Sequence, residues 1–324
     1  MDPDRLRVGV NETRRAVLDA LADGPVSGPA LAADLEVSRA AVWKHVEALR
    51  DAGFVVESDA DGYVLDAVPE FGGLAVEYGL DAPFAVEYHD SIPSTNDRAR
   101  ELAAAGRDDV VVLADEQTGG RGRLERAWSS PSGGVWASVV CRPDLPPARV
   151  SLLTTAASVA FGDAVEATGV EAAIKWPNDL LVPDDDAARG GRKLAGVLTE
   201  MEGEAGRVSW VVVGVGLNAN VPEEDLPPGA TSLLAETGGP VDRRALVQRA
   251  LERFAALRDD PERAREAWRE RSATLGERVR VTLPAETLVG TAADVTEAGA
   301  LVVETDGGER RTVHAGECEH LRPA

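Results

Sequence analysis

The chain has 324 residues, enough for two or three domains with cores of their own. Its formal net charge of -22, from 56 acidic and 34 basic side chains, argues against a general binder of nucleic acid or anionic membranes, which would be basic. The two cysteines form no disulfide framework, and neither an uncharged apolar span nor an apolar signal core is found, so we expect a cytoplasmic protein without a membrane partner. The dispersed acidic residues, with arginine in place of lysine, suggest adaptation to high salt.

Residues 1–66 have the pattern of a winged helix-turn-helix. Apolar residues at helical spacing predict three helices, of which the third is capped by Ser38 and ends at Gly53. An Asp-Gly turn at Asp61 and Gly62 then joins two short strands. The outer face of the third helix offers four residues to a DNA groove, namely Ser38, Arg39, Trp43 and Lys44. The segment holds seven basic and thirteen acidic residues, so a solvated face on a domain kept for packing is the alternative.

The rest of the chain divides by composition. Residues 67–83 are punctuated by glycine and proline and predict a linker. Residues 84–272 mix strands and helices and predict an α/β domain, whereas residues 273–324 form short β-rich runs and predict a small barrel-like module. Within the α/β domain we expect strands at 84–88, 110–114, 135–140, 180–182, 194–199 and 208–215, and helices at 152–165, 243–257 and 261–272.

Lysine has nearly disappeared from this chain. Only Lys44, Lys175 and Lys193 occur among the 34 basic residues, which leaves 31 arginines. A surviving lysine is a candidate for chemistry that needs a compact point charge rather than a planar fork. Survival by drift is the alternative for any one of them, but Lys175 opens the string KWPND and Lys193 lies in the string RKLAG.

A glycine-rich string, EQTGGRGRLERAW, occupies residues 116–128. Its glycines allow the backbone to approach a ligand, and the guanidiniums of Arg121 and Arg123 can grip phosphate oxygens. Taken alone, the string also fits a flexible turn. Three further glycines leave room for a ligand against a sheet: Gly196, Gly214 and Gly216.

The string KWPND is more specific. Pro177 forces an extended or turn conformation on Trp176, and Asn178 and Asp179 can point an amide and a carboxylate at a purine or a metal. The string STN, residues 94–96, follows the first strand of this domain and could simply cap a helix.

Together the strings STN, Q-x-x-GRGR, KWPND, RKLAG and GxGxN, in this order, resemble the biotin protein ligases over nearly the whole chain. The resemblance implies a multidomain α/β protein with a winged helix-turn-helix, a mixed-sheet core similar to class II aminoacyl-tRNA synthetases and an SH3-like C-terminal barrel. The implied reaction joins biotin to ATP, with Mg²⁺ present, to give biotinyl-5'-AMP. A lysine of a biotin carboxyl carrier protein then takes the biotinyl group.

The resemblance also implies roles for the residues of these motifs. The biotin site would comprise Ser94, Thr95, Asn96, Gln117, Arg121, Gly122, Arg123, Lys193, Gly196, Gly214 and Gly216. The catalytic charges would be Lys193, Arg121 and Arg123, with Lys193 between the biotin carboxylate and the α-phosphate. The nucleotide would meet Arg123, Trp128, Lys175, Trp176, Asn178 and Asn218, and the carboxylate of Asp179 would meet Mg²⁺.

The chain departs from the family at two places. Leu124 and Glu125 stand where the family repeats glycine and arginine, and a carboxylate there should weaken phosphate binding unless Arg126 or another cation pairs with it. The acidic stretch 183–192 is longer than the motifs need, so we expect a solvated surface loop.

Two alternatives remain open. A lipoate or octanoate ligase of the same fold would need no ureido partners, so Gln117 and the STN string favour biotin. A biotin-sensing transcription regulator without catalysis would not need Lys193. Repression of an operator and a homodimer are expectations that the sequence leaves undecided.

Overall fold

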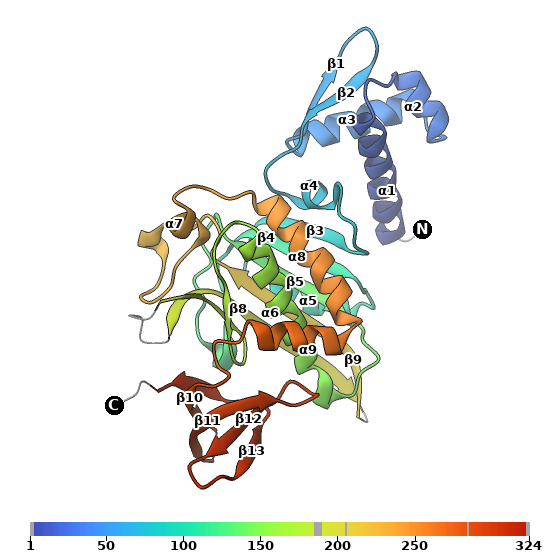
Figure 1. The fold of residues 1–324 in the computed structure, drawn as a ribbon. Helices are drawn as coiled ribbons and strands as arrows, with labels where there is room; N and C mark the ends of the chain where they lie inside the picture. Colours follow the sequence, from blue (N-terminus) through green and yellow to red (C-terminus); the bar gives the residue numbers. More distant parts are fainter. Residues whose placement is uncertain (1–2, 185–189, 205, 284, 322–324) are drawn as a thin grey trace. The chain divides into compact units, whose positions relative to one another are not determined.

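The computed structural model describes residues 3–184, 190–204, 206–283 and 285–321, so half of the predicted acidic loop at 183–192 lies outside the described residues. The chain divides into two compact units, Met1–Leu80 and Asp81–Ala324. Figure 1 shows the first unit in blue and the second in cyan to red. No helix of the described residues is long and apolar enough to cross a membrane.

The first unit is the predicted winged helix-turn-helix. Its helices are α1 (Pro3–Ala22), α2 (Gly28–Asp34) and α3 (Arg39–Asp51), and its wing is an antiparallel pair, β1 (Val55–Ser58) and β2 (Tyr63–Ala67). Helices α2 and α3 begin at serine caps: the Oγ of Ser27 accepts from the Ala30 N–H at 3.3 Å, and the Oγ of Ser38 accepts from the Ala41 N–H at 3.1 Å. In the wing turn, Gly62 has φ 135°, where a Cβ would lie 2.3 Å from the carbonyl oxygen of Val26, so only glycine fits.

The predicted linker contains structure. A short helix, α4 (Gly73–Glu77), lies within residues 67–83, and Ala75 is buried in the core of the first unit with Val17, Leu31 and Val46. The glycines that suggested a linker lie at the start of this helix: Gly72, with φ 141°, is the residue immediately before it. This stretch is therefore part of the first unit as far as Leu80.

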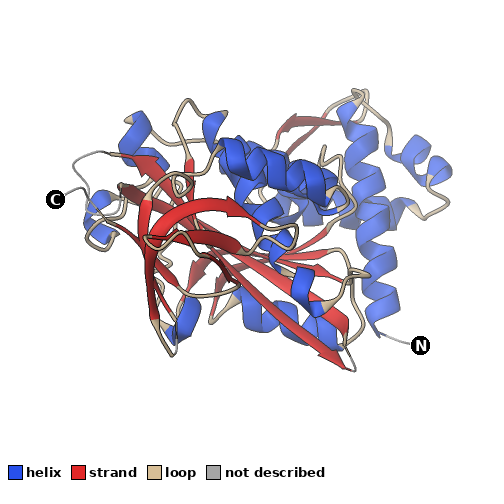
Figure 2. Ribbon diagram, turned by 60° about the horizontal axis from the view of Figure 1, so that its bottom comes forward, coloured by secondary structure: helices blue, strands red, loops and turns tan. Residues whose placement is uncertain are grey.

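The second unit is built on a seven-stranded mixed sheet, which confirms the predicted α/β class. The strand order is β3-β4-β5-β9-β8-β7-β6, in which β3 and β4 are parallel and every other pair is antiparallel. The strands are β3 (Ala85–Ile92), β4 (Val110–Gln117), β5 (Val135–Cys141), β6 (Ala173–Lys175), β7 (Asp179–Pro183), β8 (Gly191–Glu204) and β9 (Arg207–Leu217). Figure 2 shows these strands in red between helices.

Helices cover the sheet because its strands are apolar on both faces. Helix α5 (Thr95–Ala104) packs Ala99 and Ala103 against Val112 of β4 and Val212 of β9. Helix α6 (Ser151–Glu166) contacts α8 (Arg243–Arg258) and α9 (Pro261–Glu270), and Figure 1 shows the three lying together over the sheet. A further short helix is α7 (Leu233–Thr237).

The C-terminal module is the predicted small β domain. Its antiparallel sheet has the order β13-β12-β11-β10-β14, with β10 (Arg278–Thr282), β11 (Thr287–Val295), β12 (Leu301–Thr305), β13 (Arg310–Val313) and β14 (Glu317–His320). The chain enters the module beside β6, where the Ile174 N–H donates to the Arg271 carbonyl at 2.8 Å and the Ala273 N–H donates to the Ile174 carbonyl at 2.9 Å. These bonds fix the module next to the string KWPND.

Candidate active site

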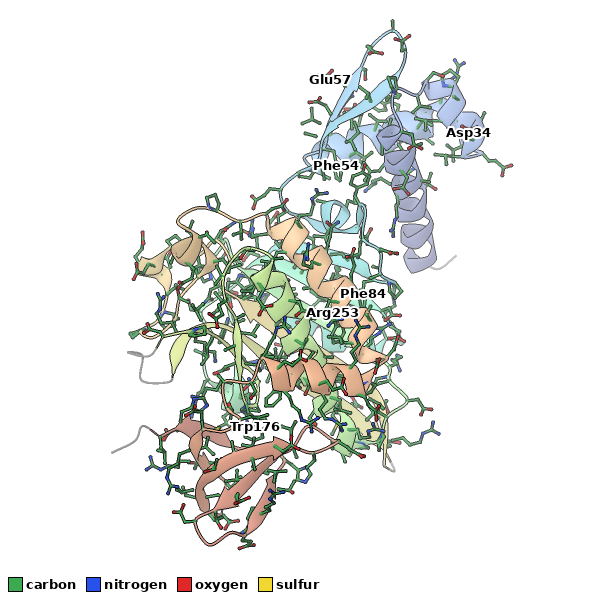
Figure 3. All side chains as sticks on the ribbon, viewed as in Figure 1. Asp34, Phe54, Glu57, Phe84, Trp176 and Arg253 are labelled. Atoms are coloured by element: carbon green, nitrogen blue, oxygen red, sulfur yellow. The ribbon has the colours of Figure 1, made fainter. Side chains whose placement is uncertain are left out.

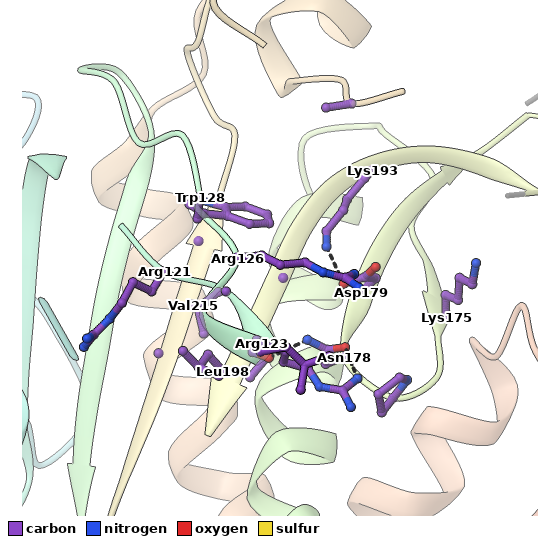
Figure 4. Close-up of a pocket in the computed structure, with 18 of the residues that line it drawn as sticks. Arg121, Arg123, Arg126, Trp128, Lys175, Asn178, Asp179, Lys193, Leu198 and Val215 are labelled. Carbon is purple, nitrogen blue, oxygen red and sulfur yellow. Dashed lines mark hydrogen bonds and ion pairs between the residues drawn. The ribbon is translucent and has the colours of Figure 1, made fainter. Parts of the chain in front are cut away.

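A cavity of about 650 Å³ gathers the predicted motifs (Figure 4). Its wall includes every residue predicted for the biotin site, and every residue predicted for the nucleotide except Asn218. The motifs that are far apart in the sequence meet because β4, β7, β8 and β9 belong to one sheet and α5 starts beside it. Two segments that the sequence did not predict complete the wall, Pro227–Ala230 and Glu317–His320.

The STN string forms a hydrogen-bonded network at the start of α5. The Oγ of Ser94 caps the helix by accepting from the Asp97 N–H at 3.2 Å. The backbone N–H and the hydroxyl of Thr95 donate to Oε1 of Gln117 at 2.8 and 3.0 Å. The buried hydroxyl of Ser138 on β5 lies 2.8 Å from the Thr95 hydroxyl. The network therefore holds a helix end and two strands in one arrangement.

Asn96 is fixed at both ends of its amide. Its Oδ1 accepts from the Ser138 hydroxyl at 2.6 Å, and its Nδ2 donates to Oε2 of Glu200 at 2.7 Å. Gly214 lies directly against it, since a Cβ at position 214 would be 2.0 Å from the Asn96 Oδ1. Glycine is required at this position because the amide occupies the space of a side chain.

Trp128 covers the floor of the cavity. Its ring lies where a Cβ at Gly196 would approach within 3.3 Å and a Cβ at Gly216 within 2.7 Å. Its indole Nε1 is buried and has no hydrogen-bond partner among the described residues. The Nε1 lies against Gly216, 2.7 Å from where a Cβ would be, so the indole is packed closely on the sheet.

Lys193 and Asp179 face each other across β8 and β7. The Lys193 Nζ lies 2.6 Å from the Asp179 Oδ1 and 4.9 Å from the centre of the Trp128 ring. The backbone of Lys193 is held on its other side, where its N–H donates to the Gly229 carbonyl at 2.9 Å and its carbonyl accepts from the Thr231 N–H at 2.9 Å. Figure 4 shows this pair inside the cavity, so the ammonium is preorganised there.

The glycine-rich loop holds Arg123 over the same region. The guanidinium donates to the Asn178 Oδ1 at 3.3 Å and to the Gly316 carbonyl at 3.0 Å. Burial lowers the pKa of Arg123, and the neighbouring charge of Arg126 acts in the same direction. Leu124 and Glu125 both have φ 55°, an unfavourable conformation for residues with a side chain, and the loop therefore carries strain.

The remaining loop arginines pair with acidic residues. Arg121 pairs with Asp97, and Figure 4 shows its guanidinium directed away from Lys193. The Glu125 carboxylate lies 3.7 Å from the Arg121 guanidinium, whereas Arg126 pairs with Glu317. The cation that compensates Glu125 is therefore Arg121 rather than Arg126.

The string KWPND joins the cavity to the C-terminal module, and Figure 3 shows Trp176 at this junction. The backbone N–H of Trp176 donates to the Thr274 hydroxyl at 3.0 Å. The same hydroxyl lies 3.1 Å from the His320 Nε2. Burial lowers the pKa of His320 to about 4, and the charge of the buried Lys175 acts in the same direction. Strand β14 thus belongs to the wall of the site.

Asn218 does not line the cavity. Its side-chain amide is buried and donates to the Thr231 carbonyl at 2.9 Å, and its backbone N–H donates to the Leu194 carbonyl at 3.0 Å. The side chain therefore ties the end of β9 to the segment after it. The predicted contact with a nucleotide has no counterpart in this arrangement, because the amide is turned into the protein.

The sequence did not predict two residues that hold Asn96, namely Ser138 and Glu200. A signal for Ser138 existed, since it is the single hydroxyl in the otherwise apolar string VWASVVC at residues 135–141. A polar side chain in the middle of a buried strand needs a partner. Glu200 has no comparable local signal.

Asp179 is the residue implied to meet Mg²⁺. Within the described ranges, no cluster of three His, Cys, Asp or Glu could hold a metal ion. Asp179 presents one carboxylate to the cavity, already paired with Lys193. Because Mg²⁺ is commonly bound by one or two carboxylates together with substrate phosphates, these residues fit an ion that arrives on a nucleotide.

The surface of α3 matches the predicted DNA-reading face in part. Arg39 and Lys44 are exposed, and Trp43 has 54% of its surface exposed. The Ser38 hydroxyl accepts from the Ala41 N–H at 3.1 Å, so it is engaged as the helix cap.

Three family models match successive parts of the chain. The HTH domain matches residues 13–64, the biotin/lipoate A/B protein ligase family matches residues 88–218, and the biotin protein ligase C terminal domain matches residues 274–321.

Several known proteins are similar to this chain in sequence, and a solved structure is similar to it in fold. The bifunctional ligase/repressor BirA of Bacillus subtilis is 35% identical over 309 residues, with 90% of this chain and 92% of that protein covered. The biotin--[acetyl-CoA-carboxylase] ligase of Mycobacterium tuberculosis is 38% identical over 236 residues, with 69% and 84% covered. The solved structure of the biotin protein ligase from Aquifex aeolicus in complex with biotin and ATP is 25% identical, has a TM-score of 0.60, and covers 74% of this chain and 99% of that chain.

Proposed function

Since the chain belongs to the biotin protein ligases, in the bifunctional form with an N-terminal helix-turn-helix domain, we propose that its 650 Å³ cavity converts biotin and ATP into biotinyl-5'-AMP. The observation that carries this proposal is the Lys193 ammonium, which Asp179 holds at 2.6 Å in the same cavity as the guanidinium of Arg123. This is where two anionic substrates would have to meet.

Biotin is proposed to lie with its ureido ring against the network of Thr95, Asn96 and Gln117. A ureido group has one strong acceptor and two N–H donors, and it needs a wall that supplies both kinds of partner. The hydroxyls, amide and carboxylate around Ser138 supply them in fixed positions. The apolar tail of biotin would run from this network toward Lys193, along the Trp128 ring that lies over Gly216.

The first step is a displacement at phosphorus. A carboxylate oxygen of biotin forms a bond to the α-phosphorus of ATP, the bond to the bridging oxygen of the β-phosphate breaks, and pyrophosphate leaves with its electron pair. Both reactants are anions, so a cation is needed between them. Lys193 has three N–H donors and can give one to Asp179 and the others to the meeting oxygens. Mg²⁺ would arrive with the ATP phosphates and meet Asp179.

The nucleotide is proposed to lie toward Trp128, Trp176 and Asn178. The side chains of Trp128 and Trp176 line the cavity, and β14 closes this end of it. Arg123 stands between this end and Lys193, where it can hold the phosphate of the adenylate.

In the second step an amine replaces AMP. The neutral amine of an acceptor lysine attacks the biotinyl carbonyl, the bond to the phosphate oxygen breaks, AMP leaves, and the amine releases a proton. We propose that the acceptor is a lysine of a biotin carboxyl carrier protein. Mass spectrometry of such a carrier after incubation with the enzyme, biotin and ATP would detect the added biotinyl group.

The exchange of pyrophosphate into ATP tests the first step. With Mg²⁺ present, biotin should drive the exchange and lipoate should not, because polar groups arranged for a ureido ring would stay unpaired around lipoate. Exchange with lipoate alone would assign the chain to the lipoate ligases. Tight biotin binding without any exchange would favour a regulator that only senses biotin.

The helix-turn-helix domain is proposed to bind operator DNA through Arg39, Trp43 and Lys44. The domain is acidic, so repulsion from the duplex should be strongest in dilute buffer. We expect binding that falls little, or even rises, from 0.1 to 3 M KCl, whereas a basic reader loses affinity steeply with salt. Fluorescence anisotropy on DNA from the chain's own gene neighbourhood measures this, and a steep loss would refute the mechanism.

A further inference from the structure

A second cavity, of about 180 Å³, adjoins the first. The two share part of their walls, namely Arg123, Trp176, Pro177, Asn178, Val197 and Leu198. The rest of the second cavity comes from the first turn of α6, from α9 and from the C-terminal module. None of the described residues that line it is acidic, in a chain with a net charge of -22. Its chemistry is therefore opposite to that of the protein surface.

Arg265 on α9 supplies one positive charge. Its Nε is buried and has no hydrogen-bond partner in the described part of the chain. Asp294 interacts with it electrostatically, but the Asp294 carboxylate is held by Arg269 at 2.8 and 3.2 Å and does not line the cavity. A guanidinium donor is thus buried at the cavity without an oxygen to receive it, which is unfavourable unless an anion enters.

Arg123 supplies the second charge, and it stands where the two cavities meet. Its guanidinium donates hydrogen bonds to neutral oxygens, those of Asn178 and Gly316. The hydroxyls of Ser151 and Thr155, from the first turn of α6, also line the space, but they already donate to the carbonyls of Ala298 and Ser151. The two guanidiniums would therefore contribute most of the binding of an anion.

We propose that this second cavity is a pyrophosphate site. It would hold the β- and γ-phosphates of ATP while the α-phosphate lies beside Lys193, and it would keep the pyrophosphate until release. The proposal rests on the proposed function, since adenylation is the step that produces pyrophosphate. It adds Arg265, a residue that belongs to none of the motifs, as a binding residue for the leaving group.

Pyrophosphate exchange in an Arg265→Ala variant tests the proposal. The pyrophosphate concentration for half-maximal exchange should rise about tenfold, and so should the concentration that inhibits adenylation as a product, because a charge-assisted contact to phosphate is lost. The Kd for biotin should stay within twofold. The matched control is Arg263→Ala, which removes the same charge from the exposed side of the same helix and should change neither quantity by more than twofold.

The KM for ATP distinguishes two sources of the bound phosphates. If the KM for ATP rises together with the pyrophosphate concentration for half-maximal exchange, the terminal phosphates of ATP occupy the site. If the KM for ATP is unchanged, the site binds only the product pyrophosphate. Either result, with the rise in the pyrophosphate concentration, supports the site. An Arg265→Gln variant, which keeps an N–H donor on a shorter, uncharged side chain, guards against misfolding of the alanine variant and should show an intermediate effect.

Failure of the site and failure of the proposed function give different results. If the wild type exchanges pyrophosphate and both Arg265 variants fold and exchange with unchanged pyrophosphate constants, the site is wrong and the adenylation stands. If the wild type binds pyrophosphate in a calorimetric titration, loses this binding in Arg265→Ala, and yet never exchanges, the site stands and the adenylation is wrong. A wild type that binds no pyrophosphate in the titration refutes the site.

Discussion

Replacing Lys193 is the most direct test of how the cavity works. A unit charge about 4 Å from a phosphate oxygen contributes about 4 kcal/mol at an effective dielectric constant of about 20. Asp179, at 2.6 Å, neutralises part of this charge before substrates bind. Loss of a preorganised charge at a developing oxyanion typically costs about 3 to 4 kcal/mol, so Lys193→Ala should slow adenylation about 10²- to 10³-fold.

The arginine variant separates position from charge. Lys193→Arg keeps the charge, but its longer planar fork would have to fit beside the Trp128 ring and Gly196, where a Cβ at 196 would already lie 3.5 Å from the lysine Cε. We therefore expect it to recover less than a tenth of the lost rate. Lys44→Ala is the control, since it removes one of the three lysines from the other compact unit.

Single-turnover formation of biotinyl-5'-AMP, followed by quenching and chromatography, is the appropriate assay because it isolates the chemical step. Circular dichroism should show that each variant keeps its fold. A Lys193→Arg enzyme with the full wild-type rate would refute the argument that a compact ammonium is required. A Lys193→Ala enzyme slowed less than tenfold would show that the charge beside Asp179 is structural.

Three further changes follow from the contacts around the cavity. Gly214→Ala should weaken biotin binding at least tenfold by calorimetry, because the new Cβ would displace the Asn96 amide from both of its partners, whereas Gly239→Ala, with no atom within 4 Å, should leave it unchanged. Arg123→Gly should release the adenylate early, so that biotin appears on unrelated proteins in a streptavidin blot; labelling confined to the carrier would show that this guanidinium is not the latch. Because burial lowers the pKa of His320 to about 4, below its usual 6.5, the unfolded state binds the proton first, and stability should fall as the pH falls from 6.5 toward 4. After allowance for solvent screening we expect about 1 kcal/mol between pH 7 and pH 5, and a His320→Gln variant that lost as much stability in urea titrations would exclude this histidine as the cause.

The elements that were predictable have a strong local pattern. The apolar run predicted as a strand at 135–140 and the helix predicted from residue 261 depend only on neighbouring residues, and they appear in the structure as β5 and α9. Strand β14 was missed because ECEH has no alternation of apolar residues. Its conformation comes from pairing with β10, which no local pattern records.

The candidate site also has residues that the sequence predicted and residues that it could not predict. The motifs predicted which residues line the cavity, because each brings its ligand-facing side chains within a few positions. Their supporting partners could not be predicted, since the Ser138 hydroxyl is 42 residues from Asn96 and the Glu200 carboxylate is 104 residues from it. For Asn218 the motif predicted a contact with the nucleotide that the structure does not show. Its amide donates instead to the buried carbonyl of Thr231, 13 residues away.

Gly196 and Gly216 stand directly opposite each other on β8 and β9, a place where two side chains would normally pack together. The ring of Trp128, from a loop, fills that volume instead. The three positions should therefore evolve as one unit, in which a larger residue at either glycine is tolerated only with a smaller one at 128. Such an exchange would move the wall of the cavity while keeping the sheet packed, and it offers natural variation and protein engineering a route to ligands of a different shape.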